Sequence, residues 1–100
     1  MQVEFGPEAL DDVEEIARYC LEIRSSLAVR FSLELTEAIG QLAEHPLIGA
    51  AIEGYEPLRR WHLATLPYLL IYVLQPDRVQ VVQVFHPRRD PDDLREGRLR

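Results

Sequence analysis

The sequence predicts an α+β fold made of an N-terminal strand, an antiparallel helical hairpin and a three-stranded antiparallel meander. Two segments before residue 46 place apolar residues at the three- and four-residue spacing of helices. Three short segments after residue 57 are rich in β-branched and aromatic residues and are separated by turn residues. A chain of 100 residues, 47% of them apolar, fits one domain spanning 1–100.

The first elements are a short strand and a helix. Gln2–Phe5 alternates apolar and polar residues as a strand does, and Gly6-Pro7 ends it. Pro7 suits the first position of a helix, and acidic residues follow at the positive end of the helix dipole. A helix from residue 7 to about 24 is expected to bury one apolar stripe, formed by Leu10, Val13, Ile16, Ala17, Cys20 and Leu21.

A second helix is expected to follow almost at once. Ser25-Ser26 provides a break and a cap, and His45-Pro46 ends the periodic pattern. The short connection predicts that the two helices run antiparallel. The apolar stripe of this helix is Leu27, Phe31, Leu35, Ala38, Ile39 and Leu42.

Residues 47–57 have no sustained period and are predicted to form a loop. The three strands that follow are expected at 58–65, 68–74 and 78–86, with turns at Leu66-Pro67 and at Gln75-Pro76-Asp77. The segment 87–93 is expected to leave the sheet, and the last seven residues to form a polar turn or tail.

The central strand of this meander is apolar or aromatic on both faces, which is unusual for a sheet that meets water on one side. Leu69, Ile71 and Val73 alternate with Tyr68, Leu70, Tyr72 and Leu74. Two helices cover only one face, so the sequence predicts that something else covers the other. The candidates are a partner chain, a self-association contact and the C-terminal tail, and the partner chain is favoured.

Composition and charge narrow the function classes. All 11 basic residues are arginines, and 17 acidic residues bring the net charge to −6. Up to Leu58 there are 3 Arg and 12 acids (net −9), and beyond it 8 Arg and 5 acids (net +3). Any contact with a polyanion must therefore come from the C-terminal arginines. Arginine also pairs well with carboxylates, although base composition explains the lack of lysine equally well.

The remaining composition points to a cytoplasmic chain without a cofactor. No secretory signal or membrane span is readable, and a lone cysteine, Cys20, fits a reducing compartment and a place in the core. Three histidines at widely separated positions match no metal-ligand spacing. We therefore expect no metal, no cofactor and no membrane partner.

The ordered combination of segments resembles the ParE/RelE superfamily of bacterial toxins from type II toxin–antitoxin modules. The resemblance covers nearly the whole chain and rests on Ala9-Leu10-Asp11-Asp12-Val13 in the first helix, Leu58-Arg59-Arg60, Pro67-Tyr68 and the ending Val82-Gln83-Val84-Phe85-His86-Pro87-Arg88-Arg89-Asp90-Pro91. It implies two helices on a twisted antiparallel sheet, with the first strand at or near an edge. It also implies a cognate antitoxin that wraps around the toxin and neutralises it. The expected assembly is a homodimer or a toxin–antitoxin hetero-oligomer.

The superfamily has two branches with different targets. One inhibits DNA gyrase by binding, and the other cuts messenger RNA on the ribosome. The nuclease branch commonly has an arginine after the first tyrosine of the central strand, where this chain has Leu69, and a tyrosine beyond the last strand, where this chain has none. The sequence therefore favours gyrase inhibition. The alternatives are a ribosome-dependent endoribonuclease and an inactive antitoxin-binding module.

Candidate site residues follow from the same comparison. If the chain is a nuclease, the partial site is His86, Arg88, Arg89, Arg60 and His62. The residues expected to contact the target or the antitoxin are Arg59, Arg60, Trp61, Tyr68, Tyr72, His86, Arg88 and Arg89. Each also has a structural interpretation: core packing for the tyrosines and Trp61, ordinary hydrogen bonding for the histidines, and surface ion pairs for the arginines.

Overall fold

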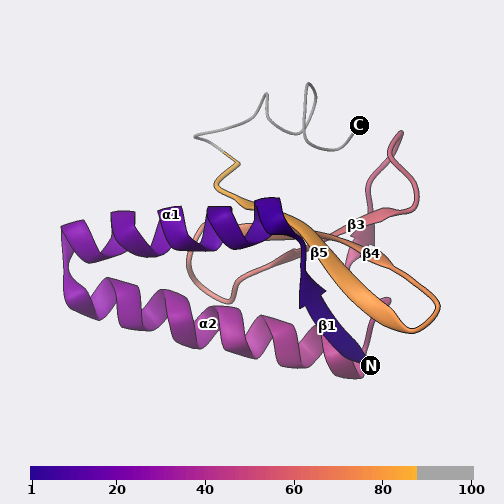
Figure 1. Cartoon of the computed structure of the whole chain (residues 1–100), viewed down its shortest axis with the longest axis horizontal. Helices are drawn as coiled ribbons and strands as arrows, with labels where there is room; N and C mark the ends of the chain where they lie inside the picture. Colours follow the sequence, from indigo (N-terminus) through magenta and orange to yellow (C-terminus); the bar gives the residue numbers. More distant parts are fainter. Residues whose placement is uncertain (88–100) are drawn as a thin grey trace.

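A computed structural model describes residues 1–87 and contains two helices and one five-stranded sheet (Figure 1). The chain begins with strand β1 (Gln2–Phe5), which leads into the two helices, and then returns through the remaining strands. In chain order the later elements are α1 (Pro7–Ile23), α2 (Ser25–Glu44), β2 (Ala50–Ala51), β3 (Leu58–His62), β4 (Leu69–Leu74) and β5 (Arg78–Phe85). The predicted α+β architecture is confirmed.

The sheet is mixed, with the strand order β1-β5-β4-β3-β2. The meander from β3 to β5 is antiparallel, as predicted, and β1 lies at an edge and pairs in parallel with β5. Strand β2 was not predicted: it pairs antiparallel with β3 inside the segment expected to be a loop. Two alanines carry too little pattern to reveal a strand, and only the pairing with β3 defines it.

Strand β3 ends at His62 and not at residue 65. The chain turns there, and Leu63 donates its backbone N–H to the carbonyl of Tyr68 across the turn. The backbone N–H groups of Thr65 and Leu66 donate to the carboxylate of Glu34 on α2 and not to another strand. Because a side chain of α2 satisfies these groups, residues 63–67 need no neighbouring strand.

Both helices lie on one face of the sheet, here called the helix side, and run antiparallel (Figure 1). The junction is Arg24, an extended residue between Ile23 and Ser25, so the predicted break at Ser25-Ser26 and its cap were wrong by one residue. Helix α2 begins at Ser25 without a side-chain cap. One extended residue is enough to reverse the chain direction.

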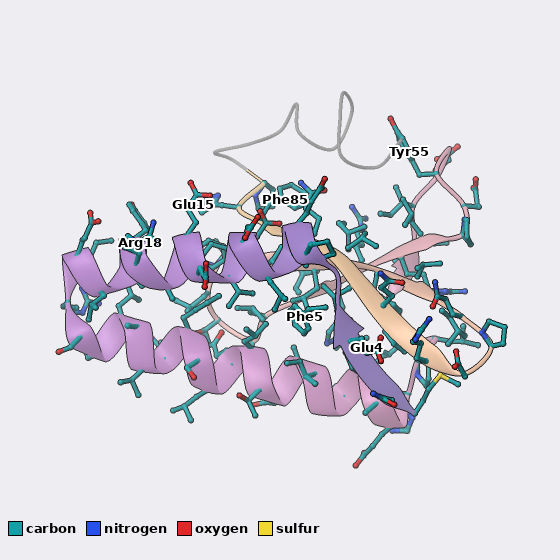
Figure 2. All side chains as sticks on the ribbon, viewed as in Figure 1. Glu4, Phe5, Glu15, Arg18, Tyr55 and Phe85 are labelled. Atoms are coloured by element: carbon teal, nitrogen blue, oxygen red, sulfur yellow. The ribbon has the colours of Figure 1, made fainter. Side chains whose placement is uncertain are left out.

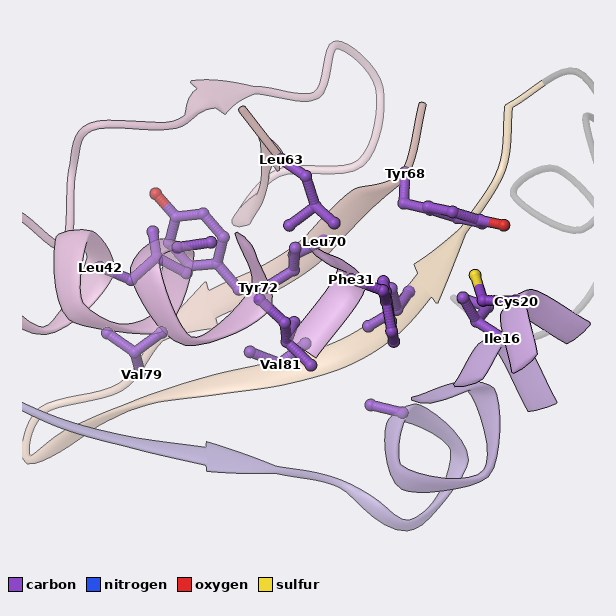
Figure 3. Close-up of a cluster of buried hydrophobic side chains, with 14 residues drawn as sticks. Ile16, Cys20, Phe31, Leu42, Leu63, Tyr68, Leu70, Tyr72, Val79 and Val81 are labelled. Atoms are coloured by element: carbon purple, nitrogen blue, oxygen red, sulfur yellow. The ribbon is translucent and has the colours of Figure 1, made fainter. Parts of the chain in front are cut away.

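The core fills the space between the helices and the sheet (Figure 3). The stripe predicted for α2 is confirmed, because its residues are buried or partly buried. The stripe predicted for α1 was partly wrong, since Leu10 is 54% and Leu21 60% exposed. The buried residues of α1 are Ala9, Asp12, Ile16 and Cys20, with Cys20 in the core as expected.

The carboxylate of Asp12 explains why the buried face of α1 differs from the predicted one. Strand β1 ends at Phe5, so the second half of β5 has no neighbour on that edge. There Asp12 Oδ2 accepts a hydrogen bond of 2.9 Å from the backbone N–H of Val84. The face of α1 that carries Asp12 must therefore point to the sheet, and Leu10 and Leu21 turn outward.

The opposite face of the sheet, here called the far side, carries a second apolar cluster. Leu69, Ile71 and Phe85 are at most 5% exposed, and Ile52, Leu58 and Val82 pack against them. Part of the cover expected for this face therefore comes from the described chain itself, and a partner chain over the rest of it stays a prediction. Ile52 comes from the connection between β2 and β3, which carries Tyr55 at its tip (Figure 2). The expected C-terminal tail lies outside the described residues.

Candidate partner-binding surface

Strand β3 distributes its four polar or aromatic side chains to both sides of the sheet. Arg59 pairs with Tyr72 and Trp61 with Leu70, which both belong to the core on the helix side. Side chains alternate along a strand, so Arg60 and His62 project to the far side. Both are exposed. Of the predicted contact residues on β3, these two are the ones a large partner can reach directly.

Arg59 and Tyr72 hold the loop after α2 against the sheet. The Tyr72 hydroxyl donates to the carbonyl of Pro46 at 2.8 Å and accepts from the N–H of Gly49 at 2.9 Å. The guanidinium of Arg59 donates to the Gly49 carbonyl at 2.7 Å. Burial raises the pKa of Tyr72, while the Gly49 N–H and the charge of Arg59 partly oppose the rise. These contacts give both residues a structural role.

Gly49 is required at the centre of this cluster. A Cβ atom on Gly49 would lie 2.5 Å from the carbonyl oxygen of Arg60 and 2.7 Å from the Tyr72 hydroxyl. Trp61 makes a similar internal contact, because its indole N–H donates to Gln41 on α2 at 2.9 Å. Of the predicted contact residues, Arg59 and Tyr72 therefore hold the loop after α2 against the sheet, and Trp61 holds β3 against α2.

Tyr68 and His86 form an aromatic stack at the end of the sheet. Tyr68 is 5% exposed and meets Phe31 of α2 edge-on, with ring centroids 5.5 Å apart. The ring of His86 makes a second T-shaped contact with Tyr68, also with centroids 5.5 Å apart. Because Tyr68 belongs to the core on the helix side, the half-buried His86 lies on that side as well.

The predicted nuclease residues are therefore not gathered in one place. His86 packs on Tyr68 on the helix side, whereas Arg60 and His62 project to the far side. Arg88 and Arg89 lie outside the described residues. Within residues 1–87, no three side chains of His, Cys, Asp or Glu form a group that could hold a metal ion. No described helix is long and apolar enough to cross a membrane.

Glu34 is a buried carboxylate that the sequence patterns did not single out. It accepts hydrogen bonds from the backbone N–H groups of Thr65 and Leu66 at 2.9 and 3.0 Å and from the Thr65 hydroxyl. Arg30 lies 3.6 Å away, one turn earlier on α2. Burial alone would raise the pKa of Glu34, but the bonds from Thr65 and Leu66 and the charge of Arg30 outweigh it and lower the pKa.

Asp12 and Glu34 were detectable in principle. Asp12 is three residues from Ala9 and four from Ile16, and Glu34 is three from Phe31 and four from Ala38, so each stands on the buried stripe of its helix. A carboxylate on such a stripe needs hydrogen-bond donors from elsewhere in the chain. Hydropathy patterns treat it as an interruption and so miss it.

Two helices against one face of a mixed five-stranded sheet define a small α+β domain. Residues 3–91 match the sequence profile of the family described as the ParE toxin of the type II toxin–antitoxin system, parDE. The chain belongs to this family. The resemblance inferred from the residues is confirmed.

A solved structure supports the same fold. The chain is similar to a protein in the structure titled "Chromosomal ParDE TA system from P. aeruginosa", with a TM-score of 0.70 and 18% sequence identity. The match covers 86% of this chain and 95% of that chain. A search of curated proteins found no match.

Proposed function

We propose that this ParE-family toxin inhibits DNA gyrase by binding and does not cut RNA. The observation that carries the proposal is the separation of His86 from Arg60 and His62 on the two sides of the sheet. Metal-free RNA cleavage needs a base, an acid and a cation around one phosphate. Side chains on opposite faces of a sheet cannot meet at a single phosphate, because the sheet itself lies between them.

Overall charge also supports a protein target over the ribosome. The net charge is −6, so the chain as a whole is repelled by RNA. Basic residues concentrate after Leu58, so any attraction to a polyanion comes from that part of the sequence. We propose that this part acts on gyrase in the cytoplasm, where it stabilises the enzyme with its DNA cleaved.

The far side of β3 is the proposed contact surface. Arg60 and His62 project from it, next to the partly buried Leu58. Charged groups around an apolar centre are typical of protein interfaces. We expect Arg60→Ala with His62→Ala to weaken gyrase inhibition while leaving thermal stability unchanged. The matched control is Arg18→Ala, which removes an exposed arginine from α1 (Figure 2).

Supercoiling by purified gyrase, titrated with this chain, tests the proposal. We expect supercoiling to stop as wild type or Arg18→Ala is added, and to continue at the same concentrations of the double variant. Undisturbed supercoiling in all three proteins, together with new RNA ends in a translation reaction, would replace gyrase inhibition with the endoribonuclease alternative. Neither activity, and no growth arrest in cells, would leave the inactive antitoxin-binding module.

We further propose that a cognate antitoxin neutralises the toxin through the same basic surface. Arginine binds carboxylates in a two-pronged geometry, so an antitoxin segment with acidic and apolar residues fits Arg60 and Leu58. The protein encoded beside this chain is the candidate to test. Co-expression is expected to restore growth and to yield a complex, and Arg60→Glu is expected to weaken that complex. An Arg60→Glu complex as tight as wild type would exclude this surface.

A further inference from the structure

Helix α2 carries a second stripe of apolar and small residues, on the side that points away from the core. Val29 is 58% and Leu33 67% exposed there, and because they are four residues apart they form one small apolar patch on the helix surface. Figure 1 shows α2 along the border of the molecule, with no other described element beyond its outer side. Within residues 1–87, Val29 and Leu33 therefore stay largely uncovered.

The spacing of the stripe is that of a helix-pairing seam. Its members recur at alternating steps of three and four residues, as in the apolar positions of paired helices: Ser26, Val29, Leu33, Thr36, Gly40 and Ala43. The hydroxyl of Thr36 donates to the carbonyl of Ser32 within the helix at 2.8 Å. Its hydrogen-bonding need is met internally, so Thr36 suits an apolar contact.

Gly40 is an independent sign that another chain comes close. Glycine destabilises the interior of a helix relative to alanine. A Cβ atom on Gly40 would meet nothing within 4 Å, so packing inside the chain gives no reason for glycine. The close approach of another helix would explain the glycine, because the missing side chain leaves room for a bulky neighbour.

We propose that α2 pairs antiparallel with α2 of a second copy of this chain. The N-terminal half of the stripe on one copy then lies against the C-terminal half of the stripe on the other copy. In this register Leu33 lies opposite Thr36 of the second copy, and Val29 lies opposite Gly40. Each bulky residue then faces a small one, and two-fold symmetry repeats both contacts. A different partner helix would need to supply this complementary pattern, whereas a second copy already carries it.

Charges beside the stripe fit the same register. This register places Arg30 next to Glu37 of the second copy and Arg24 near Glu44 of the second copy. Two-fold symmetry makes each contact twice. Arg30 is 57% exposed despite its contact with Glu34, so it is available to a second carboxylate. Arg24, Val29 and Arg30 also border a surface depression of about 340 Å³, which offers space for the end of the opposite helix.

The size of the contact sets the expected affinity. A helix of 20 residues is about 30 Å long, so this pairing buries an area at the small end of specific interfaces. Such interfaces associate reversibly. We therefore expect a monomer–dimer equilibrium that shifts with concentration, which sedimentation velocity of the full chain measures directly.

Leu33→Glu is the first variant to test, because it places a charge opposite Thr36 without touching the core. We expect it to weaken the dimer roughly tenfold or more. The matched control, Leu21→Glu, changes a residue that is 60% exposed on α1 and is expected to leave the dimer intact. A wild-type chain that stays monomeric at every concentration would overturn the proposal, and so would a dimer that survives Leu33→Glu.

Charge reversal tests the register. Arg30→Glu alone places two carboxylates together, and Glu37→Arg alone places two guanidinium groups together, so each is expected to weaken the dimer. The double variant restores opposite charges and is expected to recover it. Failure of the double variant to recover, with its circular dichroism unchanged, would exclude this antiparallel register. The proposal stands independently of the gyrase target.

Discussion

Replacing Glu34 is predicted to separate the charge of this residue from its hydrogen bonds. Both backbone donors, on Thr65 and Leu66, bind the same oxygen, Oε1. A glutamine keeps a carbonyl oxygen at that position, but its NH2 group replaces the Oε2 that accepts from the Thr65 hydroxyl. Glu34→Gln is therefore expected to lose the charge and this one acceptor, at a cost of about 1 kcal/mol. Glu34→Ala leaves both donors and the Thr65 hydroxyl without this acceptor and is expected to cost about 3 kcal/mol.

The size of the second effect makes it easy to measure. A domain of this length has a free energy of unfolding of about 5–15 kcal/mol. A loss of about 3 kcal/mol lowers the melting temperature of such a domain by roughly 12–24 °C. Thermal unfolding followed by circular dichroism measures both variants, with Glu14→Gln as a control because Glu14 is exposed on α1.

The pH dependence supplies the sharper test. Folding lowers the pKa of Glu34 from its ordinary value of 4.5, so the unfolded chain takes up the proton first as the pH falls. The stability from its charge is therefore complete above 4.5 and disappears as the pH drops through the lower folded value. The difference in the free energy of unfolding between wild type and Glu34→Gln should therefore disappear in acid. A gap that is absent at neutral pH, or that does not change with pH, would refute this reasoning.

Substitutions at three further positions test the contacts that hold the sheet in place, each by chemical denaturation. Asp12→Ala removes the acceptor for the Val84 N–H and should cost about 2 kcal/mol, whereas Asp12→Asn keeps an oxygen and should cost less. Tyr72→Phe should cost about 1–3 kcal/mol, because the Gly49 N–H loses its acceptor in a buried place. Gly49→Ala should cost at least as much, since its Cβ would overlap the Arg60 carbonyl. Wild-type stability in any of these variants would contradict the contact concerned.

Local patterns predicted most of the secondary structure. The apolar stripe of α2 stands out because it repeats at one period over many residues, and the three meander strands stand out as short apolar or alternating runs between turn residues. The orientation of α1 was missed because a buried aspartate determines it, and Asp12 is buried only because Val84 lies across from it. The parallel pairing of β1 with β5 and the two-residue strand β2 depend on residues far apart in the sequence, which periodicity does not report.

The candidate site was predictable as a list of residues and not as an arrangement. Arg59 and Arg60 are neighbours of the same type, yet one is bound to the Gly49 carbonyl and the other projects to the far side. The same holds for His86, whose separation from His62 depends on which side of the sheet each faces. Alternation along β3 predicts that its side chains divide between two faces, but only the packed helices show which face lies against the core.

Whether DNA stays cleaved in a gyrase reaction that contains this chain tests the central claim most directly. Gyrase, plasmid DNA and the toxin are mixed without ribosomes, and the protein is then denatured and digested before electrophoresis. Binding to the cleaved state predicts linear DNA that increases with toxin concentration and decreases when Arg60 and His62 are both replaced by alanine. Plasmid that remains intact at a large excess of toxin would contradict it.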